Sequence, residues 1–168
     1  MKLLIVRHAD AGDHEEFART GKPDDQRPLS KKGVDQMKSA VEGLKQLVPA
    51  ADLIVTSPFV RAAQTADIVR EAYGDDVPLE ITDTLEPLRP PVAFETWLRE
   101  REARDVVVAV GHEPHLGRLA TWFMTGTDDS AVNFKKGGAC LIVFEKKVKR
   151  GSGVLRWSMG PAELKAIG

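Results

Sequence analysis

Hydrophobic residues along this chain fall into two patterns that alternate from the amino end to the carboxyl end. Short continuous apolar runs are typical of strands buried on both faces, and apolar residues spaced three or four apart are typical of amphipathic helices. Continuous runs predict strands at residues 3–6, 53–55, 77–81, 106–110, 139–145 and 154–158. Helical spacing predicts helices at residues 30–48, 59–73, 93–101 and 116–124.

Strands that alternate with helices predict an α/β fold with a largely parallel sheet. The last two strands are joined by a basic turn at residues 146–153, which predicts a hairpin and therefore an antiparallel edge. A chain of 168 residues is the right size for one domain that buries its own core, and no repeat, low-complexity segment or linker interrupts it. We therefore expect a single domain spanning residues 1–168.

The first predicted strand ends in Arg7 and His8, which are the first candidates for chemistry. Open α/β sheets bind ligands just beyond the carboxyl ends of their strands, where both side chains are expected. An imidazole can be a nucleophile or base, and a guanidinium can hold two oxygens of an anion, so the pair favours phosphate chemistry. From these two residues alone, a surface arginine and a capping histidine are an equal alternative.

Three more polar residues, Arg61, Glu86 and His112, lie at or just after the ends of later strands. Because parallel strands end at one edge of a sheet, all these side chains are expected to converge there. Two arginines, two histidines and one acid would neutralise a dianion and supply a nucleophile and a proton donor. The polar stretch 11–27 is long enough to act as a partial flap, and we otherwise expect a shallow, open cleft with an exposed His8.

These residues resemble those of one known family. The segments that carry the resemblance are Arg7-His8-Ala9, Ser57-Pro58, Arg61-Ala62 with Gln64-Thr65, and Gly111-His112. Together they resemble the histidine phosphatase superfamily, which has the phosphoglycerate mutase-like fold, over nearly the whole chain. The compact length and the segments 27–33 and 157–161 are most similar to the small bacterial SixA-type phosphohistidine phosphatases. Ala9 departs from the usual glycine of the family at a permissive position.

The resemblance implies a three-layer α/β/α sandwich and a phosphatase that needs no metal or cofactor. It implies that His8 is the nucleophile that becomes phosphorylated, and that Arg7, Arg61 and His112 hold the phosphoryl oxygens. Ser57 is expected to bind the substrate with them. The physical chemistry agrees, because a neutral imidazole can attack phosphorus in line while guanidinium groups offset charge on the equatorial oxygens.

The favoured substrate is phosphohistidine carried by a protein. One alternative is a phosphomonoesterase of the same superfamily that acts on a small molecule. Another is a non-catalytic adaptor domain that binds phosphate, although a binding module does not need a nucleophilic imidazole such as His8. Hydrolysis of a chromogenic phosphoester would separate an enzyme from an adaptor.

For the other polar residues, an ordinary structural or solvent-exposed position is an alternative to a functional role. Glu86 lies where the family often has its acid, but the neighbourhood is equally consistent with an exposed turn. His14 and His115 have no supporting pattern, and His14 is expected to be a solvated loop residue. His112 and His115 superficially suggest a metal site, but Pro114 interrupts any helix that could carry both ligands and no cluster of acids or thiols accompanies them.

Composition narrows the possible partners. The 24 basic and 25 acidic residues leave a formal charge of −1, which predicts no broad affinity for nucleic acid or anionic membranes. Cys140 is the single cysteine and lies in an apolar run, so an internal disulfide is excluded and a reducing compartment is favoured. No cleavage-site pattern and no apolar run of about 18 residues occurs. We expect a cytoplasmic protein, monomeric by default.

Overall fold

Six strands form a single sheet in the computed structural model, which describes residues 1–168. The strands are β1 (Lys2–Arg7), β2 (Leu53–Thr56), β3 (Leu79–Ile81), β4 (Val106–Gly111), β5 (Ala139–Val143) and β6 (Val154–Met159). Their order across the sheet is β3-β2-β4-β1-β5-β6. The first four pair in parallel, and β5 is antiparallel to both β1 and β6, so the mostly parallel sheet with an antiparallel edge is confirmed.

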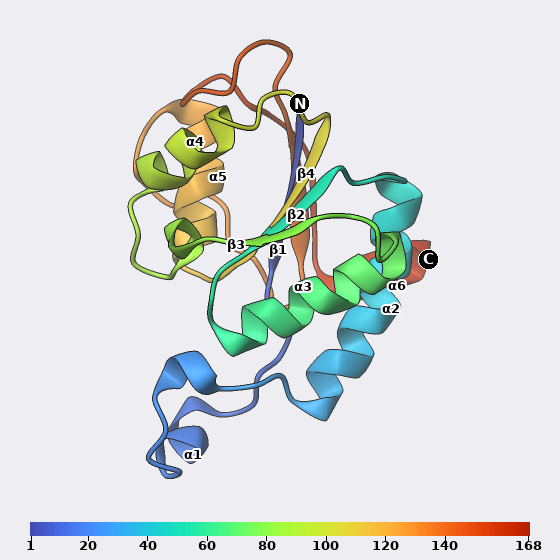
Figure 1. Cartoon of the computed structure of the whole chain (residues 1–168), viewed down its shortest axis with the longest axis vertical. Coiled ribbons are helices and arrows are strands. Elements are labelled where there is room, and N and C mark those ends of the chain that lie inside the picture. Colours follow the sequence, from blue (N-terminus) through green and yellow to red (C-terminus); the bar gives the residue numbers. More distant parts are fainter.

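Helices cover both faces of this sheet, as Figure 1 shows. They are α1 (His14–Ala18), α2 (Lys31–Leu47), α3 (Val60–Tyr73), α4 (Pro91–Arg99), α5 (His115–Thr125) and α6 (Pro161–Ile167), with short 3₁₀ helices η1 (Asp24–Gln26) and η2 (Asp83–Leu85). One face is covered by α2, α3 and α6, and the other by α4 and α5. The expected three-layer α/β/α sandwich is therefore confirmed. None of the helices combines the length and hydrophobicity that a membrane span requires.

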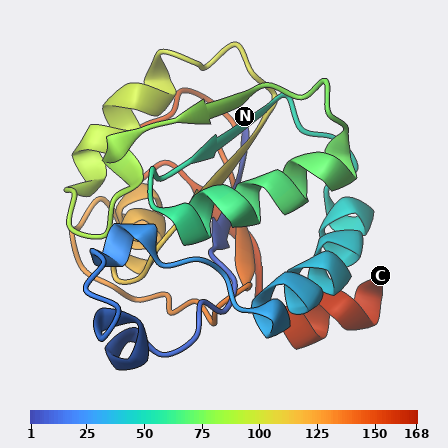
Figure 2. The same cartoon turned by 60° about the horizontal axis from the view of Figure 1, so that its bottom comes forward.

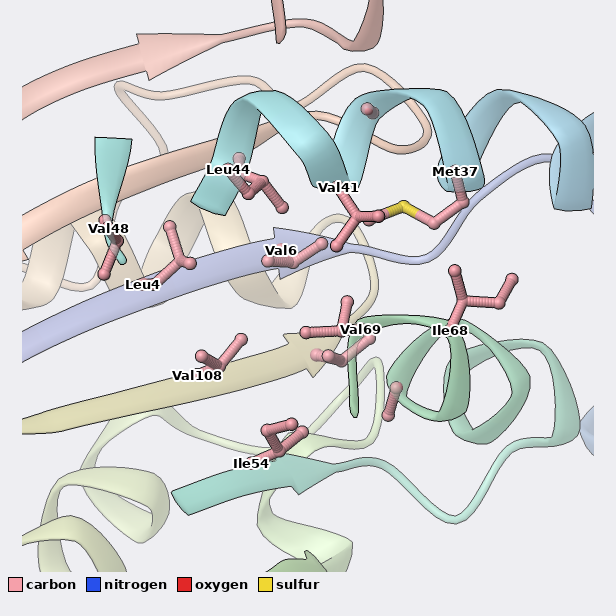
Figure 3. Packing of buried hydrophobic residues seen from close by; sticks show 14 of the residues in the cluster. Leu4, Val6, Met37, Val41, Leu44, Val48, Ile54, Ile68, Val69 and Val108 are labelled. Carbon is pink, nitrogen blue, oxygen red and sulfur yellow. The ribbon is translucent and has the colours of Figure 1, made fainter. Parts of the chain in front are cut away.

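Strand β1 shows why its apolar run is continuous. Leu4 and Val6 point into the core beneath α2 and α3, where they join Val41 (Figure 3). Leu3 and Ile5 point the opposite way, into the core beneath α4 and α5. Successive side chains of a strand alternate between faces, so a sheet covered on both sides demands apolar residues at every position. Burial on both faces fixes the register of β1 and hence the place of the residues that follow it.

Helix α2 packs tightly against the loop that follows β1. Ser30 caps its N-terminus by accepting a hydrogen bond from the Gly33 N–H at 3.0 Å, and its hydroxyl donates to the Asp10 carboxylate at 2.8 Å. Gly33 lies so close to the Asp10 backbone that no side chain would fit, and Gly43 lies equally close to the Leu164 carbonyl in α6. These glycines let α2 hold both neighbouring segments in place.

The predicted elements differ from the structure mainly outside the strands. No hydrophobic pattern predicted α1, η1 or α6, because α1 and η1 bury no residue and α6 buries only Pro161 and Leu164. The strand predicted at 77–81 begins at Leu79, and the one predicted at 139–145 ends at Val143. Figure 2 shows the segment with α1 and η1 in blue, beside the start of α3.

Candidate active site

Pairing of β1 with β4 places His8 beside His112. Arg7 pairs with Gly111, and the His8 backbone N–H donates to the Gly111 carbonyl at 3.0 Å. The two imidazole rings have centroids 5.0 Å apart and are tilted by 55°. Arg61 lies in the first turn of α3, which follows the adjacent strand β2. The structure thus brings four of the predicted site residues to one edge of the sheet.

His8 is held as a neutral imidazole with one free nitrogen. Its Nδ1 lies 2.7 Å from the Ala9 carbonyl oxygen, which can only accept, so Nδ1 carries the proton and Nε2 keeps its lone pair. Burial, together with the charges of Arg61 and Arg7 and against the opposing hydrogen bond to Ala9, lowers the pKa of His8 to about 4. Only 5% of His8 is exposed, so the expectation of an exposed nucleophile is wrong.

The segment 11–27 reaches the site through Asp24 in η1. The Asp24 carbonyl oxygen accepts from Nη1 of Arg61 at 2.8 Å, and its carboxylate lies 3.0 Å from Nη2. The same carboxylate accepts from Nε of the buried Arg27 at 2.8 Å. His14 is solvated as expected, but it begins helix α1 rather than lying in a loop, and its Nε2 lies 3.5 Å from Asp24. Sequence reasoning missed Asp24 and Arg27 because contacts between a polar loop and a distant helix leave no local pattern.

Arg7 is hydrogen-bonded to a backbone carbonyl, and the side chain of Glu113 holds that part of the backbone in position. Its Nη1 donates to the Phe134 carbonyl oxygen. The Phe134 N–H donates to Oε1 of Glu113 at 2.8 Å, and Oε2 of Glu113 accepts from the Gly117 N–H at 3.1 Å. Burial lowers the pKa of Arg7, and the negative charge of Glu113 opposes that shift. Sequence reasoning missed Glu113, although its place directly after the Gly-His motif was an available signal.

The second histidine of the site, His112, is almost fully buried between two other side chains. Its Nε2 lies 2.8 Å from Oγ of Ser57, and its ring centroid lies 4.9 Å from that of Phe59. Burial, together with the positive charges of the nearby arginines, lowers the pKa of His112 to about 2, so this ring is also neutral. His115 is buried in α5 with no partner on either ring nitrogen. No group of three or more His, Cys, Asp or Glu residues that could hold a metal ion occurs.

Glu86 lies on the rim of the site. Its side chain is 32% exposed and lies 3.4 Å from Nε of Arg89. Glu86 and Phe59 line a surface hollow of about 500 Å³, and Phe59 also packs against His112. No hydrogen bond or ion pair joins Glu86 to any of the other five predicted site residues, which are Arg7, His8, Ser57, Arg61 and His112. Both interpretations of Glu86, a proton donor and an exposed turn residue, are consistent with this position.

Three buried nitrogen atoms at this edge have no hydrogen-bond partner within the protein: Nε of Arg7, Nε of Arg61 and Nδ1 of His112. Buried polar groups are normally paired, so a cluster of them calls for an explanation. Guanidinium N–H groups make their strongest hydrogen bonds with carboxylate or phosphate oxygens. Beside a neutral imidazole with a free lone pair, this arrangement suits an oxyanion that undergoes nucleophilic attack.

Comparisons with known proteins point the same way. Residues 3–88 match the family model described as histidine phosphatase superfamily (branch 1). An uncharacterised protein of Picosynechococcus sp. is 36% identical over 140 residues, which cover 82% of each chain. Phosphohistidine phosphatase SixA of Escherichia coli is 25% identical over 167 residues, covering 98% of this chain and 97% of the relative.

The fold has a solved counterpart of nearly the same length. The structure of the protein histidine phosphatase SixA complexed with tungstate matches with a TM-score of 0.83 at 24% identity, covering 98% of this chain and 99% of that one. The family match includes Arg7, His8 and Arg61, and the full-length matches extend over His112. The chain therefore belongs to the histidine phosphatase superfamily, and it is a phosphatase that resembles the SixA-type members.

Proposed function

We propose that this enzyme removes the phosphoryl group from a phosphohistidine side chain of a protein, through a phosphohistidine intermediate on His8. The observation that carries the proposal is the state of His8. Its Nδ1 proton is committed to the Ala9 carbonyl, while the charges of Arg7 and Arg61 act on the ring from nearby. The Nε2 lone pair is therefore available for attack on phosphorus in a site that attracts a dianion.

In the first step, Nε2 of His8 forms a bond to phosphorus while the bond from phosphorus to the leaving nitrogen breaks. Arg7 and Arg61 offset the charge on the equatorial oxygens through N–H groups that have no acceptor within the protein. The departing imidazole leaves as a neutral base when its second nitrogen already carries a proton. No metal ion takes part in this step.

In the second step, water attacks the phosphoryl group on His8. The bond between phosphorus and Nε2 breaks, phosphate is released with the proton that water gives up, and His8 regains its lone pair. A phosphorylated imidazole is labile enough for this hydrolysis because its leaving nitrogen is a weak base, with a conjugate-acid pKa of ~6.5. The cycle returns the enzyme unchanged.

Phosphohistidine, unlike an alkyl phosphoester, does not require Glu86 as a proton donor. An alkoxide leaving group needs a proton in the transition state, whereas a neutral imidazole does not. Glu86 lies on the rim and is paired with Arg89 rather than with the buried cluster. The relative in Escherichia coli is a phosphohistidine phosphatase, which supports the same substrate class for this chain.

The proposed setting is the cytoplasm, with a phosphoprotein as the partner and the enzyme as a monomer. The single cysteine, Cys140, is buried and unpaired, which fits a reducing compartment. A formal charge of −1 gives no general attraction to nucleic acid or anionic membranes.

The experiment that tests the substrate compares kcat/KM for a phosphohistidine-bearing carrier domain with a panel of sugar phosphates, phosphoglycerates and nucleotides, with and without EDTA. We expect the carrier domain to be the best substrate and EDTA to have no effect. A small metabolite better by about tenfold, or about 1.4 kcal/mol in the transition state, would favour the small-molecule phosphomonoesterase. Phosphate binding without turnover of any substrate would favour the adaptor.

A further inference from the structure

We propose that Ser57 is a positioning residue that holds His112 in the tautomer with its proton on Nδ1. In this tautomer His112 offers an N–H, rather than a lone pair, to the phosphoryl oxygens. The role of that N–H rests on the proposed function, whereas the tautomer itself does not. Ser57 was expected to bind the substrate, and in the structure its hydroxyl contacts His112 instead.

The hydroxyl proton of Ser57 has a single possible hydrogen-bond acceptor. Oγ of Ser57 lies 2.8 Å from Nε2 of His112, and the two residues are 0% and 1% exposed. The same oxygen accepts the Phe59 N–H at 3.3 Å, which uses an acceptor position and leaves the hydroxyl proton free. Because Nε2 of His112 is the only acceptor within reach of that proton, Nε2 must carry the lone pair. A neutral imidazole has a single ring N–H proton, which then lies on Nδ1.

In the opposite tautomer, buried hydrogen-bonding groups would lack suitable partners. With the proton on Nε2, Oγ of Ser57 would accept two hydrogen bonds and its own proton would have no acceptor. Nδ1 of His112 would then present a lone pair toward any bound oxyanion and would repel it. Nδ1 has no partner within the protein, as is true of Nε of Arg7 and Nε of Arg61. A proton on Nδ1 makes all three atoms donors, which suits one anion.

The backbone holds Ser57 and His112 at the ends of paired strands. Thr56 pairs with Val110 in β2 and β4, and the Ser57 N–H donates to the Val110 carbonyl at 3.1 Å. The Phe59 ring packs against the imidazole and restricts its rotation. Burial lowers the pKa of His112, so the ring has one proton to place rather than two.

His8 and His112 therefore carry their protons on the same ring atom for opposite purposes. In His8 the Nδ1 proton is used internally by the Ala9 carbonyl, which leaves Nε2 as the nucleophile. In His112 the Ser57 hydroxyl occupies Nε2, which leaves the Nδ1 proton for the substrate. One hydrogen bond on each ring therefore decides that His8 provides the attacking nitrogen and that His112 provides the hydrogen-bond donor.

Long-range ¹H–¹⁵N correlation spectra of the labelled full-length protein test the tautomer directly, because protonated and unprotonated ring nitrogens have well-separated shifts. Signals of His112 are assigned by their loss in His112→Gln. We expect Nδ1 protonated and Nε2 unprotonated in the native protein. A protonated Nε2 in His112 would overturn the proposal.

Variants test whether Ser57 is responsible. In Ser57→Ala we expect a mixture of tautomers or a protonated Nε2, and an increase of about tenfold in the Kd of tungstate. Ser39→Ala, a serine on α2 outside the site, should change neither quantity. A His112 that stays fully protonated at Nδ1 in Ser57→Ala would overturn the assignment to Ser57. Native protein with the expected tautomer but no phosphatase activity would instead contradict the proposed function and leave the tautomer standing.

Discussion

Arg61 contacts Asp24 twice, through the Asp24 carbonyl oxygen at 2.8 Å and the carboxylate at 3.0 Å. Arg61 is a predicted phosphate ligand, and Asp24 belongs to the segment 11–27 that we expected to act as a flap. The flap is thus attached to the group that would bind the substrate. A phosphoryl dianion and the Asp24 carboxylate therefore share the positive charge of Arg61.

Replacing Asp24 by asparagine should strengthen anion binding. In Asp24→Asn the single amide oxygen can accept from Arg61 when the amide NH2 faces Nε of Arg27, and the competing negative charge is gone. We expect the Kd of tungstate, measured by isothermal titration calorimetry, to fall by about twofold to fivefold, as the loss of a partly exposed ion pair predicts. Asp67→Asn, which changes an exposed acid on α3 that forms no ion pair, is the control and should leave the Kd unchanged. Weaker binding in Asp24→Asn would show that the carboxylate serves to orient Arg61.

Glu113 should matter for catalysis without touching the substrate. Its carboxylate fixes the Phe134 peptide, whose carbonyl oxygen holds Arg7. We expect Glu113→Ala to lower kcat/KM by about tenfold, because catalysis is sensitive to small displacements of a charged group. Glu102→Gln, which alters an acid bonded to Val148 instead, should have wild-type activity. Undiminished activity in Glu113→Ala would mean that Arg7 needs no such support.

Stability should fall as the pH falls below neutrality. Burial lowers the pKa of His8 and His115 from 6.5 to about 4, and that of His112 to about 2. Between pH 6.5 and about 4 the unfolded chain therefore binds more protons than the folded one, and the free energy of unfolding decreases with decreasing pH. Urea unfolding at a series of pH values measures this slope, and greater stability at pH 5 than at pH 7 would contradict it.

A variant isolates the contribution of one histidine to that slope. His115 is fully buried with no hydrogen-bond partner, so His115→Leu removes a titrating group without breaking a bond. We expect the slope of unfolding free energy against pH to become shallower by up to about 1.4 kcal/mol per pH unit. A slope equally steep in His115→Leu would assign the effect to other groups.

Glu86→Gln should slow the hydrolysis of alkyl phosphoesters more than that of phosphohistidine. The departing alkoxide needs a proton donor, whereas a neutral imidazole leaves without one. The measurement is kcat/KM of the variant and the native enzyme on both substrate classes. Equal losses on both would show that Glu86 has another role, such as holding Arg89 and the rim.

The sequence predicted the strands and the meeting of the main site residues because both depend on local patterns. A strand buried on two faces needs a continuous apolar run, as Leu3 to Val6 show, and the residue after each parallel strand reaches the same edge. Arg7, His8 and His112 could be placed on that basis alone.

The rest of the site depends on contacts between distant segments. Asp24 and Arg61 are 37 residues apart, and Arg7 and Phe134 are 127 apart, so no local pattern joins them. The burial of His8 likewise depends on the residues packed around it rather than on its position after β1. Helix α6 buries only two residues, too few for its hydrophobic period to be recognised.

During turnover His8 should carry the phosphoryl group, and rapid-quench labelling with a radiolabelled phosphoprotein measures this directly. We expect acid-labile phosphate on His8 of the native enzyme within the first turnover, and neither label nor turnover in His8→Ala, whose circular dichroism spectrum should stay native. Normal turnover in His8→Ala, or label on a different residue, would contradict the covalent mechanism.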